Sequence, residues 1–327
     1  MNHSDLLVSV IIVNYNYGNF ISSAIDSALA QTYKNIEVIV VDDGSTDNSR
    51  EVIEQYSSNV IRKFKKNGGQ ASAFNAGFEL SSGDIICFLD SDDYFKPDKI
   101  EKIIALFKDY PKSGWVFHQY KNFDNITNKT ISIHPPDFAT TEIDFTEKIA
   151  SGEKPTFAPA TSSLCFRRAV LEKILPMPEA SGILIADNYI KYVALYLYPG
   201  YFHNEILTGL RIHKNNNLSL QEKAKLTDSL FDIYTSFHLL IHFPGLFKFT
   251  HRLFGIELGK YWKNRSSSQD RKQLATTEHM ISSYLSKVSL TQKVKILLRA
   301  FYHYQLRDLK SKSDKPYSIL KKLKRQS

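Results

Sequence analysis

The chain contains VSVIIVNYN at residues 8–16 and, after a helical segment, IEVIVVDDGSTD at residues 36–47. Each begins with an apolar, mostly β-branched run, which is typical of a strand that is buried on both faces. Such runs alternate with segments of helical periodicity, which predicts βαβ units and a mostly parallel sheet with helices on both sides. We expect strands over residues 8–13, 36–41, 59–64 and 84–89. We expect helices over residues 19–30, from the turn at 43–47 to about residue 56, over 70–80 and over 97–107.

The later part of the chain changes character twice. Residues 111–219 are less regular, with strands expected near 115–120 and 205–212 and helices near 167–175 and 187–198. Residues 220–327 carry apolar side chains at helical spacing among many basic ones, which predicts a helical, basic region. We therefore distinguish three parts, residues 1–110, 111–219 and 220–327.

The composition indicates a soluble globular protein. Of the 327 residues, 43% are hydrophobic and 23% are charged. The N-terminus lacks the basic and apolar regions of a secretory signal, and no run of about 18 uncharged apolar residues predicts a membrane span. Both cysteines, Cys87 and Cys165, lie in apolar surroundings, which suits buried thiols in a reducing compartment. We expect a cytoplasmic protein.

The net charge of +8 is unevenly distributed. Residues 220–327 hold 21 Lys and Arg against 8 Asp and Glu, whereas residues 1–219 hold 21 against 26. This basic region could meet the anionic cytoplasmic face of a membrane, and the segments 243–249 and Lys321-Lys322-Leu323-Lys324-Arg325 fit such contact. It could equally be the solvated basic face of a helical subdomain. Nucleic acid is not expected, because no binding motif accompanies the charge.

A pair of carboxylates, in Asp42-Asp43-Gly44-Ser45, follows the second buried run directly. An ionised carboxylate only accepts hydrogen bonds, so at a strand end it can accept from the N3–H of uracil or thymine. It would select against cytosine, which has an acceptor at that position. The alternative is that both aspartates serve the turn and the N-cap of the next helix.

Two glycines precede the helix expected at residue 70. They belong to Asn67-Gly68-Gly69-Gln70, which Asn75-Ala76-Gly77 follows. Glycines let backbone N–H groups approach a ligand closely, and a helix start favours an anion. The pattern is neither a Walker loop nor the dinucleotide-binding glycine fingerprint, which excludes an NAD-dependent oxidoreductase in practice. Without further context it is a loop before a helix.

Three carboxylates occur within four residues in Leu89-Asp90-Ser91-Asp92-Asp93, directly after an apolar strand. They repel one another unless a cation neutralises them, and Asp90 and Asp92 can face one site because alternate residues of an extended segment point the same way. Hard oxygen ligands suit Mg²⁺ or Mn²⁺ together with diphosphate oxygens and water. The alternative is a solvated acidic loop.

Two further polar positions stand out later in the chain. Asp187 opens an expected helix, where an aspartate often serves only as a cap. His213 ends the segment Arg211-Ile212-His213, which Asn217 and Ser219 follow, and a single histidine is often an ordinary surface or core residue.

Together these motifs resemble the inverting glycosyltransferase family 2, whose nucleotide-sugar-binding fold is called GT-A. The resemblance rests on residues 8–16, residues 41–47, Asn67 to Gln70 with 75–77, and Asp90-Ser91-Asp92-Asp93 with Pro97-Asp98. Each motif alone is weak, and their order and spacing over about 90 residues carry the resemblance. It extends more loosely to residues 211–219 and does not cover 220–327.

The resemblance implies that residues 1–110 form the donor-binding half and residues 111–219 the acceptor-side half of one catalytic domain, with a helical extension at 220–327. It implies a nucleotide site that contains Tyr15, Asn16, Asp43, Gly69, Gln70, Asp90 and Ser91, with Asp43 at the base. It also implies a divalent-metal site at Asp92 and His213, a catalytic base at Asp187, and acceptor-side residues Ser162 and Ser163. Many members have an acidic pair at the base, whereas Ala186 precedes Asp187 here.

From this resemblance we expect a metal-dependent enzyme that takes a UDP-linked sugar and uses Mg²⁺ or Mn²⁺. It would transfer one sugar, with inversion, to a hydroxyl of a glycan or lipid-linked saccharide in surface polysaccharide or glycoconjugate synthesis. Processive members carry a Gln-x-x-Arg-Trp motif and membrane spans, and this chain has neither.

Two other functions stay open at this point. A nucleotidylyltransferase would need a Gly-rich, Arg-bearing loop where this chain has Asn14-Tyr15-Asn16-Tyr17. A non-catalytic nucleotide-sugar-binding or scaffold protein fits the missing acidic partner of Asp187, although the Asp90-x-Asp92 pair disfavours it.

Overall fold

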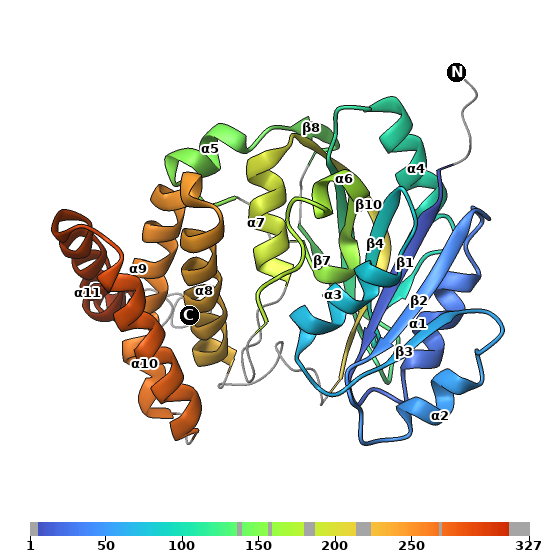
Figure 1. The fold of residues 1–327 in the computed structure, drawn as a ribbon, viewed down its shortest axis with the longest axis horizontal. Coiled ribbons are helices and arrows are strands. Elements are labelled where there is room, and N and C mark those ends of the chain that lie inside the picture. Colours follow the sequence, from blue (N-terminus) through green and yellow to red (C-terminus); the bar gives the residue numbers. More distant parts are fainter. Residues whose placement is uncertain are drawn as a thin grey trace, which may run out of the picture. The chain divides into compact units, whose positions relative to one another are not determined.

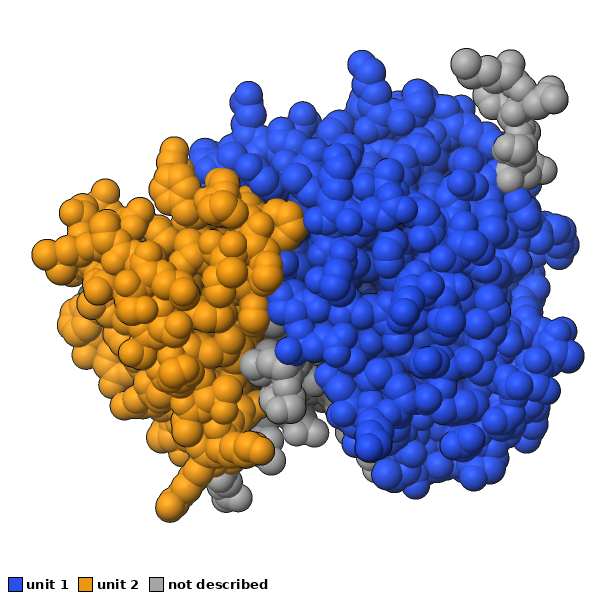
Figure 2. Space-filling model, in the orientation of Figure 1, with its two compact units in different colours: residues 1–216 blue, residues 217–327 orange. Residues whose placement is uncertain are grey.

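The structure is a computed structural model that describes residues 6–135, 139–155, 159–179, 187–213, 224–267 and 270–313. The chain forms two compact units, residues 1–216 and residues 217–327 (Figures 1 and 2). Within the described ranges, the first unit contains the sheet and the second is helical. The division of the first unit into a donor half and an acceptor half stays a prediction.

Four parallel strands form one half of the sheet, in the order β3-β2-β1-β4. They are β1 (Val8–Asn14), β2 (Ile36–Asp42), β3 (Ile61–Phe64) and β4 (Ile85–Asp90). Every residue of β1 is buried, as its mostly apolar run predicts for a central strand. The sequence prediction of a largely parallel α/β sheet is confirmed.

Three helices cover one face of these strands: α1 (Ile21–Leu29), α2 (Ser49–Glu54) and α4 (Lys99–Asp109). Their apolar residues recur at helical spacing and join alternate residues of the strands in one core, which includes Val10, Ile25, Val40, Cys87 and Ile103. The side chains of Cys87 and Cys165 are buried free thiols, as the sequence predicts.

Helix α3 (Gln70–Leu80) packs on the other alternate residues of the strands, as its contacts with β1 and β2 show (Figure 1). Phe74 meets Phe88 of β4 with ring centroids 4.6 Å apart. Gly77 lies directly on β1, where an added Cβ atom would come within 2.4 Å of Cγ2 of Ile11. The absence of a side chain at Gly77 therefore lets α3 lie in contact with the sheet.

The other half of the sheet mixes both strand directions. Strand β9 (Leu164–Arg167) lies antiparallel between β4 and β6 (Trp115–Asp124), and β10 (Gly200–Ile212) runs parallel to β6. Three short strands pair antiparallel at the periphery: β5 (Tyr94–Phe95), β7 (Thr130–His134) and β8 (Thr141–Ile143).

Short helices accompany this half of the sheet. They are α5 (Thr146–Ser151), a 3-10 turn at Thr161–Ser163, α6 (Arg168–Leu171) and α7 (Asp187–Leu197). The helix expected over residues 167–175 is much shorter, because Arg167 belongs to β9 and α6 covers four residues. The sequence interpretation missed β9, whose short run of buried apolar residues lacks a clear period.

The second unit consists of α8 (Ala224–His242), α9 (Phe247–Asn264), α10 (Arg271–Ser286) and α11 (Leu290–Ser313), with 3-10 turns at Pro244–Leu246 and Arg265–Ser267. Helix α9 packs against both α8 and α11. Ile296 and Ala300 are the buried residues of α11. In the described part of the chain, no helix has the length and apolar character needed to cross a membrane.

Candidate active site

Polar side chains gather where the parallel strands end. Asn14 pairs in register with Asp42, and Val13 pairs with Asp90, so the ends of β1, β2 and β4 lie at one sheet edge. His213 follows the end of β10, and Asp187 opens α7. In open α/β sheets, ligands bind at this edge.

Asp42 holds the first loop of the site together. Its Oδ2 accepts hydrogen bonds from Asn14 Nδ2 (2.8 Å) and Ser45 Oγ (2.6 Å), and its Oδ1 accepts from the Ser45 backbone N–H (2.9 Å). The first aspartate of the pair therefore serves the turn, which is the structural alternative that the sequence left open.

Asn16 also has a structural role that the sequence did not predict. Its φ of 59° is left-handed, its backbone N–H donates to Ser45 Oγ (2.8 Å), and its Oδ1 accepts from the Thr46 N–H (2.7 Å). These bonds connect the loop after β1 with the loop after β2. The neighbouring Tyr15 is 44% exposed and can offer its ring to a ligand. Nucleotide contact by Tyr15 and Asn16 stays a prediction.

Asp43 is buried and bound by the glycine loop that follows β3. Its Oδ1 accepts from Lys65 Nζ (2.6 Å) and the Gly68 N–H (3.0 Å), and its Oδ2 accepts from the Gly69 N–H (2.8 Å). Gly69 has a φ of +85°, which glycine adopts without strain. Since each carboxylate oxygen has two lone pairs, Oδ2 can accept one more donor.

Asp90, the next acidic residue of the candidate site, lies against the start of α3. Gln70 Nε2 is 3.3 Å from Asp90 Oδ1, and the Asp90 N–H donates to Ser162 Oγ (3.0 Å). Burial, followed by the charges of Asp92 and Asp187, raises the pKa of Asp90 to about 8. The adjacent Ser91 is buried. The structure thus brings together Gln70, Asp90 and Asp187, which are far apart in sequence.

Asp92 and His213 meet directly. Oδ2 of Asp92 lies 3.1 Å from Nε2 of His213, although 121 residues separate them. The imidazole ring packs against Phe20, with ring centroids 4.4 Å apart, and lies edge-on to Tyr17 at 5.5 Å. These aromatic contacts orient the ring so that Nε2 faces the carboxylate.

Arg211 organises the acidic loop, a role that the sequence interpretation missed. Its backbone N–H donates to Asp93 Oδ1 (3.1 Å) and its Nε donates to the Asp92 carbonyl (3.0 Å). Burial and the charges of Asp92 and Asp90 raise the pKa of Asp93 well above its ordinary value. Asp93 is therefore a buried carboxyl that connects the acidic loop to Arg211 of β10.

The two candidate acceptor-side serines are completely buried. Ser162 Oγ donates to Asp93 Oδ2 (2.6 Å), while the Ser162 carbonyl accepts from the buried Lys99 Nζ (2.8 Å). Ser163 Oγ donates to the Ala160 carbonyl (2.7 Å). Both hydroxyls thus bond within the protein, and Ser162 connects Asp90 with Asp93. Acceptor contact by Ser162 and Ser163 stays a prediction.

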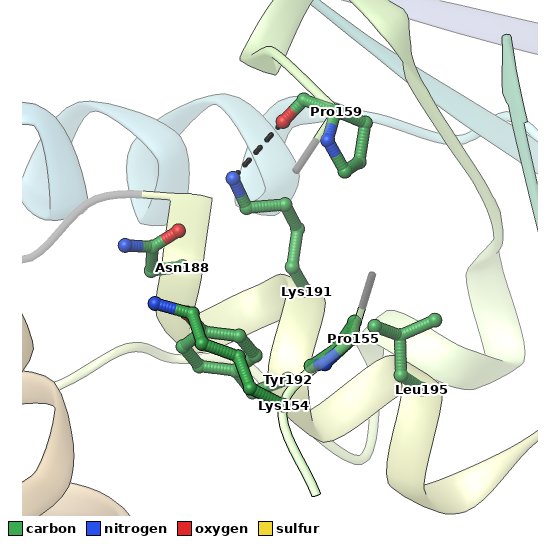
Figure 3. A pocket seen from close by; sticks show the side chains of 7 residues that line it. All are labelled: Lys154, Pro155, Pro159, Asn188, Lys191, Tyr192 and Leu195. Carbon is green, nitrogen blue, oxygen red and sulfur yellow. Dashed lines mark hydrogen bonds between the residues drawn. The ribbon is translucent and has the colours of Figure 1, made fainter. Parts of the chain in front are cut away.

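Asp187 has two partners that the sequence did not indicate. Its Oδ2 accepts from Lys191 Nζ (3.0 Å) and from Thr161 Oγ1 (3.2 Å). Lys191 is buried and also donates to the Pro159 carbonyl (3.0 Å), as Figure 3 shows. Burial and the charges of Asp187 and Asp93 raise the pKa of Tyr120, on β6, to about 12. Tyr120 is therefore a further neighbour of this site.

Lys191 lines a small pocket between the segment after α5 and the outer face of α7. Lys154, Pro155 and Pro159 come from one side, and Asn188, Tyr192 and Leu195 come from α7 (Figure 3). In that view the Lys191 ammonium group points to the Pro159 carbonyl. Other positions named from the sequence lie outside the described residues, namely Ala186, Asn217, Ser219 and the segment Lys321 to Arg325.

The family model described as "Glycosyl transferase family 2" matches residues 9–175, which include β1 to β9 and most of the site. The chain belongs to glycosyltransferase family 2. The resemblance inferred from the sequence is thereby confirmed.

Curated relatives of this glycosyltransferase match part of its length. An uncharacterised glycosyltransferase of Nostoc sp. is 40% identical over 214 residues, which are 64% of this chain and 66% of that protein. The UDP-Glc:alpha-D-GlcNAc-diphosphoundecaprenol beta-1,3-glucosyltransferase WfaP of Escherichia coli is 40% identical over 119 residues, which are 36% of this chain and 46% of that protein. The chain thus spans just under two thirds of the first and under half of the second.

Solved glycosyltransferase structures share the fold. TarS of Staphylococcus aureus in complex with UDP-GlcNAc is 17% identical, with a TM-score of 0.54 over 92% of this chain and 82% of that chain. The mannosyltransferase PcManGT of Pyrobaculum calidifontis in complex with GDP-Man and Mn²⁺ is also 17% identical, with a TM-score of 0.50 over 92% and 88%. The predicted GT-A fold with a helical C-terminal region is confirmed.

The acidic loop of this glycosyltransferase fits a divalent cation. A carboxylate oxygen and an imidazole nitrogen lie 3.1 Å apart at Asp92 and His213, next to the half-buried Asp90. A cation there would offset the repulsion between the carboxylates, and carboxylate oxygens suit Mg²⁺ or Mn²⁺. Among the described residues, no three His, Cys, Asp or Glu side chains are placed to hold a metal ion. Diphosphate oxygens and water are ligands that could complete such a site.

Proposed function

We propose that this glycosyltransferase transfers a single sugar from a UDP-linked donor, with inversion, to a hydroxyl of a lipid-linked saccharide or another glycan during surface polysaccharide or glycoconjugate synthesis. The observation that supports this most strongly is the convergence of Asp43, the Asp92–His213 pair and Asp187 at one sheet edge. Each supplies one requirement of the reaction: base recognition, charge neutralisation and proton removal.

Asp43 can recognise the base. Three donors from the loop after β3 already hold its carboxylate in place, and Oδ2 keeps one lone pair for a further donor. The N3–H of uracil supplies such a donor, whereas N3 of cytosine is an acceptor. We therefore infer that Asp43 favours a uridine nucleotide over a cytidine nucleotide, and that Tyr15 and Gly69 border the same site.

Asp92 and His213 would hold Mg²⁺ or Mn²⁺ beside the diphosphate. When bound, the cation supplies stabilisation of the negative charge that develops on the departing diphosphate. Gln70, whose Nε2 lies 3.3 Å from Asp90 Oδ1, keeps Asp90 turned toward the start of α3. Asp93 and Arg211 keep the loop in place through the bonds described above.

Asp187 would act as the general base. Its Oδ2 is held by Lys191 and Thr161, and among the described residues no donor lies on its Oδ1. Oδ1 can therefore accept the proton of the attacking acceptor hydroxyl. The acceptor oxygen forms a bond to the anomeric carbon as the bond from that carbon to the diphosphate oxygen breaks. One displacement of this kind inverts the anomeric configuration.

The acceptor proposal draws on a relative. The printed name of the Escherichia coli relative states that it acts on alpha-D-GlcNAc-diphosphoundecaprenol, a lipid-linked sugar. We propose an acceptor of the same general class for this chain. Transfer of one sugar per encounter follows from the missing Gln-x-x-Arg-Trp motif, which processive members carry.

Nucleotide binding provides the direct test of this function. We expect UDP with Mn²⁺ to raise the melting temperature, by an amount that corresponds to about 2.7 kcal/mol when UDP is at about 100 times its dissociation constant. CDP at the same concentration should stabilise the protein much less, because cytosine lacks the N3–H that Asp43 would accept. Differential scanning fluorimetry with a panel of nucleoside diphosphates measures both effects.

The panel also separates two kinds of failure. Equal stabilisation by UDP and CDP would remove Asp43 from base recognition and leave the enzyme class intact. No stabilisation by any nucleoside diphosphate with Mn²⁺ would contradict the proposed function as a whole.

A second prediction concerns Lys191 as a positioning residue. Replacing Lys191 with Met removes one of the two donors that hold Asp187 Oδ2, so the carboxylate loses its fixed orientation. We expect kcat to fall about tenfold or more, because general-base catalysis depends on a positioned carboxylate. The KM for the donor should stay within about twofold, since the hydrogen bonds of Lys191 within the described residues go to Asp187 and the Pro159 carbonyl. Steady-state kinetics measures both.

The conservative variant Lys191→Arg is the matched control. Arg keeps a cation that can reach Oδ2 of Asp187, so it should recover part of the lost kcat. If Lys191→Met and Lys191→Arg lower kcat equally and raise the donor KM equally, Lys191 acts only on the general structure of the domain.

A further inference from the structure

Helix α11 presents a row of exposed apolar side chains, which we call the α11 stripe. It consists of Leu290, Val294, Leu297, Leu298, Phe301 and Tyr302. Their spacing of three or four residues puts them along one side of the helix. Leu290 is 77% exposed and Leu298 is 65% exposed, whereas Ile296 and Ala300 of the same helix are buried. The stripe is therefore a second apolar face, additional to the one that packs within the unit.

The α11 stripe borders an open groove between α9 and α11. The groove is lined by three basic side chains, Arg252, Lys295 and Arg299, together with Ile256, His303 and two residues of the stripe, Leu298 and Tyr302. Burial and the charge of Arg252 lower the pKa of Arg299. The two guanidinium groups are thus close enough to repel each other, and an anion between them would relieve that repulsion.

The surroundings of the groove carry few negative charges. No Asp or Glu occurs between Glu278 and Asp308, a segment that holds five Lys and Arg residues. On α9 the single acidic residue, Glu257, is buried and pairs with Lys260 at 2.6 Å. In the described part of the chain, Lys295 and Arg299 form no ion pair with a carboxylate. The groove is therefore a cationic site next to an apolar row.

We propose that the α11 stripe and the adjoining groove form a docking surface for an anionic lipid bilayer, with lipid phosphate groups at Arg252, Lys295 and Arg299 and the stripe among the acyl chains. This inference extends the proposed function, because it would bring the enzyme to the membrane that holds lipid-linked acceptors. Only the biological role of the surface rests on the proposed function, because all the residues that form the surface belong to the second unit.

Charge favours a bilayer over a second copy of the chain. A two-fold dimer through this face would place the same patch on both sides, so the basic groups of one copy would approach those of the other. An anionic bilayer instead offers negative headgroups beside hydrocarbon, which matches cations beside an apolar row. The basic tail beyond residue 313 could add attraction, although the proposal does not need it.

Vesicle co-sedimentation tests the surface with the full chain. The vesicles contain phosphatidylcholine alone or with roughly one third phosphatidylglycerol, so that they differ in negative charge. We expect the protein to pellet with the anionic vesicles and to stay in solution with the neutral ones. The double substitution Leu298→Ser with Phe301→Ser should lower the partition coefficient about tenfold or more, because it removes apolar groups from the bilayer. Lys295→Glu should lower it about fivefold or more.

Each variant has a matched control. Ile126 is 83% exposed in the first unit, so Ile126→Ser removes a still more exposed apolar side chain elsewhere. Lys272 is exposed on α10, so Lys272→Glu makes the same charge change away from the groove. We expect both controls to pellet like the unmodified chain. Stabilisation by UDP with Mn²⁺, measured on every variant, shows that it is folded and keeps the donor site separate from this test.

Three outcomes would overturn the proposal. The first is that the unmodified chain stays in solution with anionic vesicles. The second is that the stripe and groove variants pellet as strongly as the unmodified chain. The third is a dimer in light scattering that Leu298→Ser with Phe301→Ser converts to a monomer, because a second copy would then cover the stripe. A protein that binds vesicles but no nucleotide would contradict the proposed function and leave the docking surface standing.

Discussion

Replacing Asp187 with Asn should lower kcat by about 10²–10⁴-fold, the range that a positioned general base contributes. Asn keeps the size of the side chain and can still accept hydrogen bonds from Lys191 and Thr161, but it cannot take a proton from the acceptor hydroxyl. Metal-dependent UDP binding should not change. The measurement is steady-state transfer to the acceptor, combined with UDP titration in the presence of Mn²⁺.

Asp144 provides a matched control for this substitution. It precedes α5, and its Oδ1 accepts the Thr146 N–H at 2.8 Å, so it is an aspartate that serves a helix start. Asp144→Asn should leave kcat nearly unchanged. If Asp187→Asn behaves in the same way and retains near-normal turnover, the base lies elsewhere and Asp187 has only a structural role.

The second large effect is expected at Asp92. Asp92→Ala removes the carboxylate that meets His213, and with it one of the two protein groups that would hold the cation. We expect the rate of transfer to fall by about 10²–10³-fold or more. This is the typical loss in kcat when one group that stabilises developing charge is removed. In contrast to Asp187→Asn, this variant should also lose the Mn²⁺ dependence of UDP binding, which isothermal titration with and without Mn²⁺ measures.

Asp98→Ala tests whether loss of any nearby carboxylate has the same effect. Asp98 lies near the acidic loop in sequence, but its side chain is 42% exposed and pairs with Lys102 at 2.7 Å. Its loss should have little effect on transfer. Asp92→Ala with unchanged Mn²⁺-dependent UDP affinity would show that the cation, if one binds, is held by other groups.

The fold of residues 1–110 was largely predictable because its signals are local. Strands β1, β2 and β4 are mostly apolar runs, and a parallel sheet places the residues at their ends at one edge. Asp43, Asp90 and Asp92 could therefore be assigned to one site without coordinates. Local patterns could not show which residue of Asp42-Asp43 serves the turn, because that depends on the position of Ser45 and of the loop that ends at Gly69.

The other side of the site depends on contacts between distant segments. Thr161 reaches Asp187 from the 3-10 turn, 26 residues away, whereas Lys191 lies one turn further along the same helix. Neither residue belongs to a recognisable motif. Arg211 was noticed only as a neighbour of His213, although its backbone and guanidinium group bond to the acidic loop 118 and 119 residues away. The hydrogen bond from Ser162 to Asp93, 69 residues away, could not be predicted from the sequence either.

The close approach of α3 to β1 at Gly77 has a consequence for the donor site. The N-cap Gly69 and the first residue, Gln70, of the same helix bond to Asp43 and Asp90. The position of α3 on the sheet therefore fixes both carboxylates relative to each other. Because Gly77 has no side chain to separate α3 from Ile11, the distance between the helix and the sheet is set by contact between apolar atoms. The distance between Asp43 and the acidic loop therefore depends on packing in the hydrophobic core.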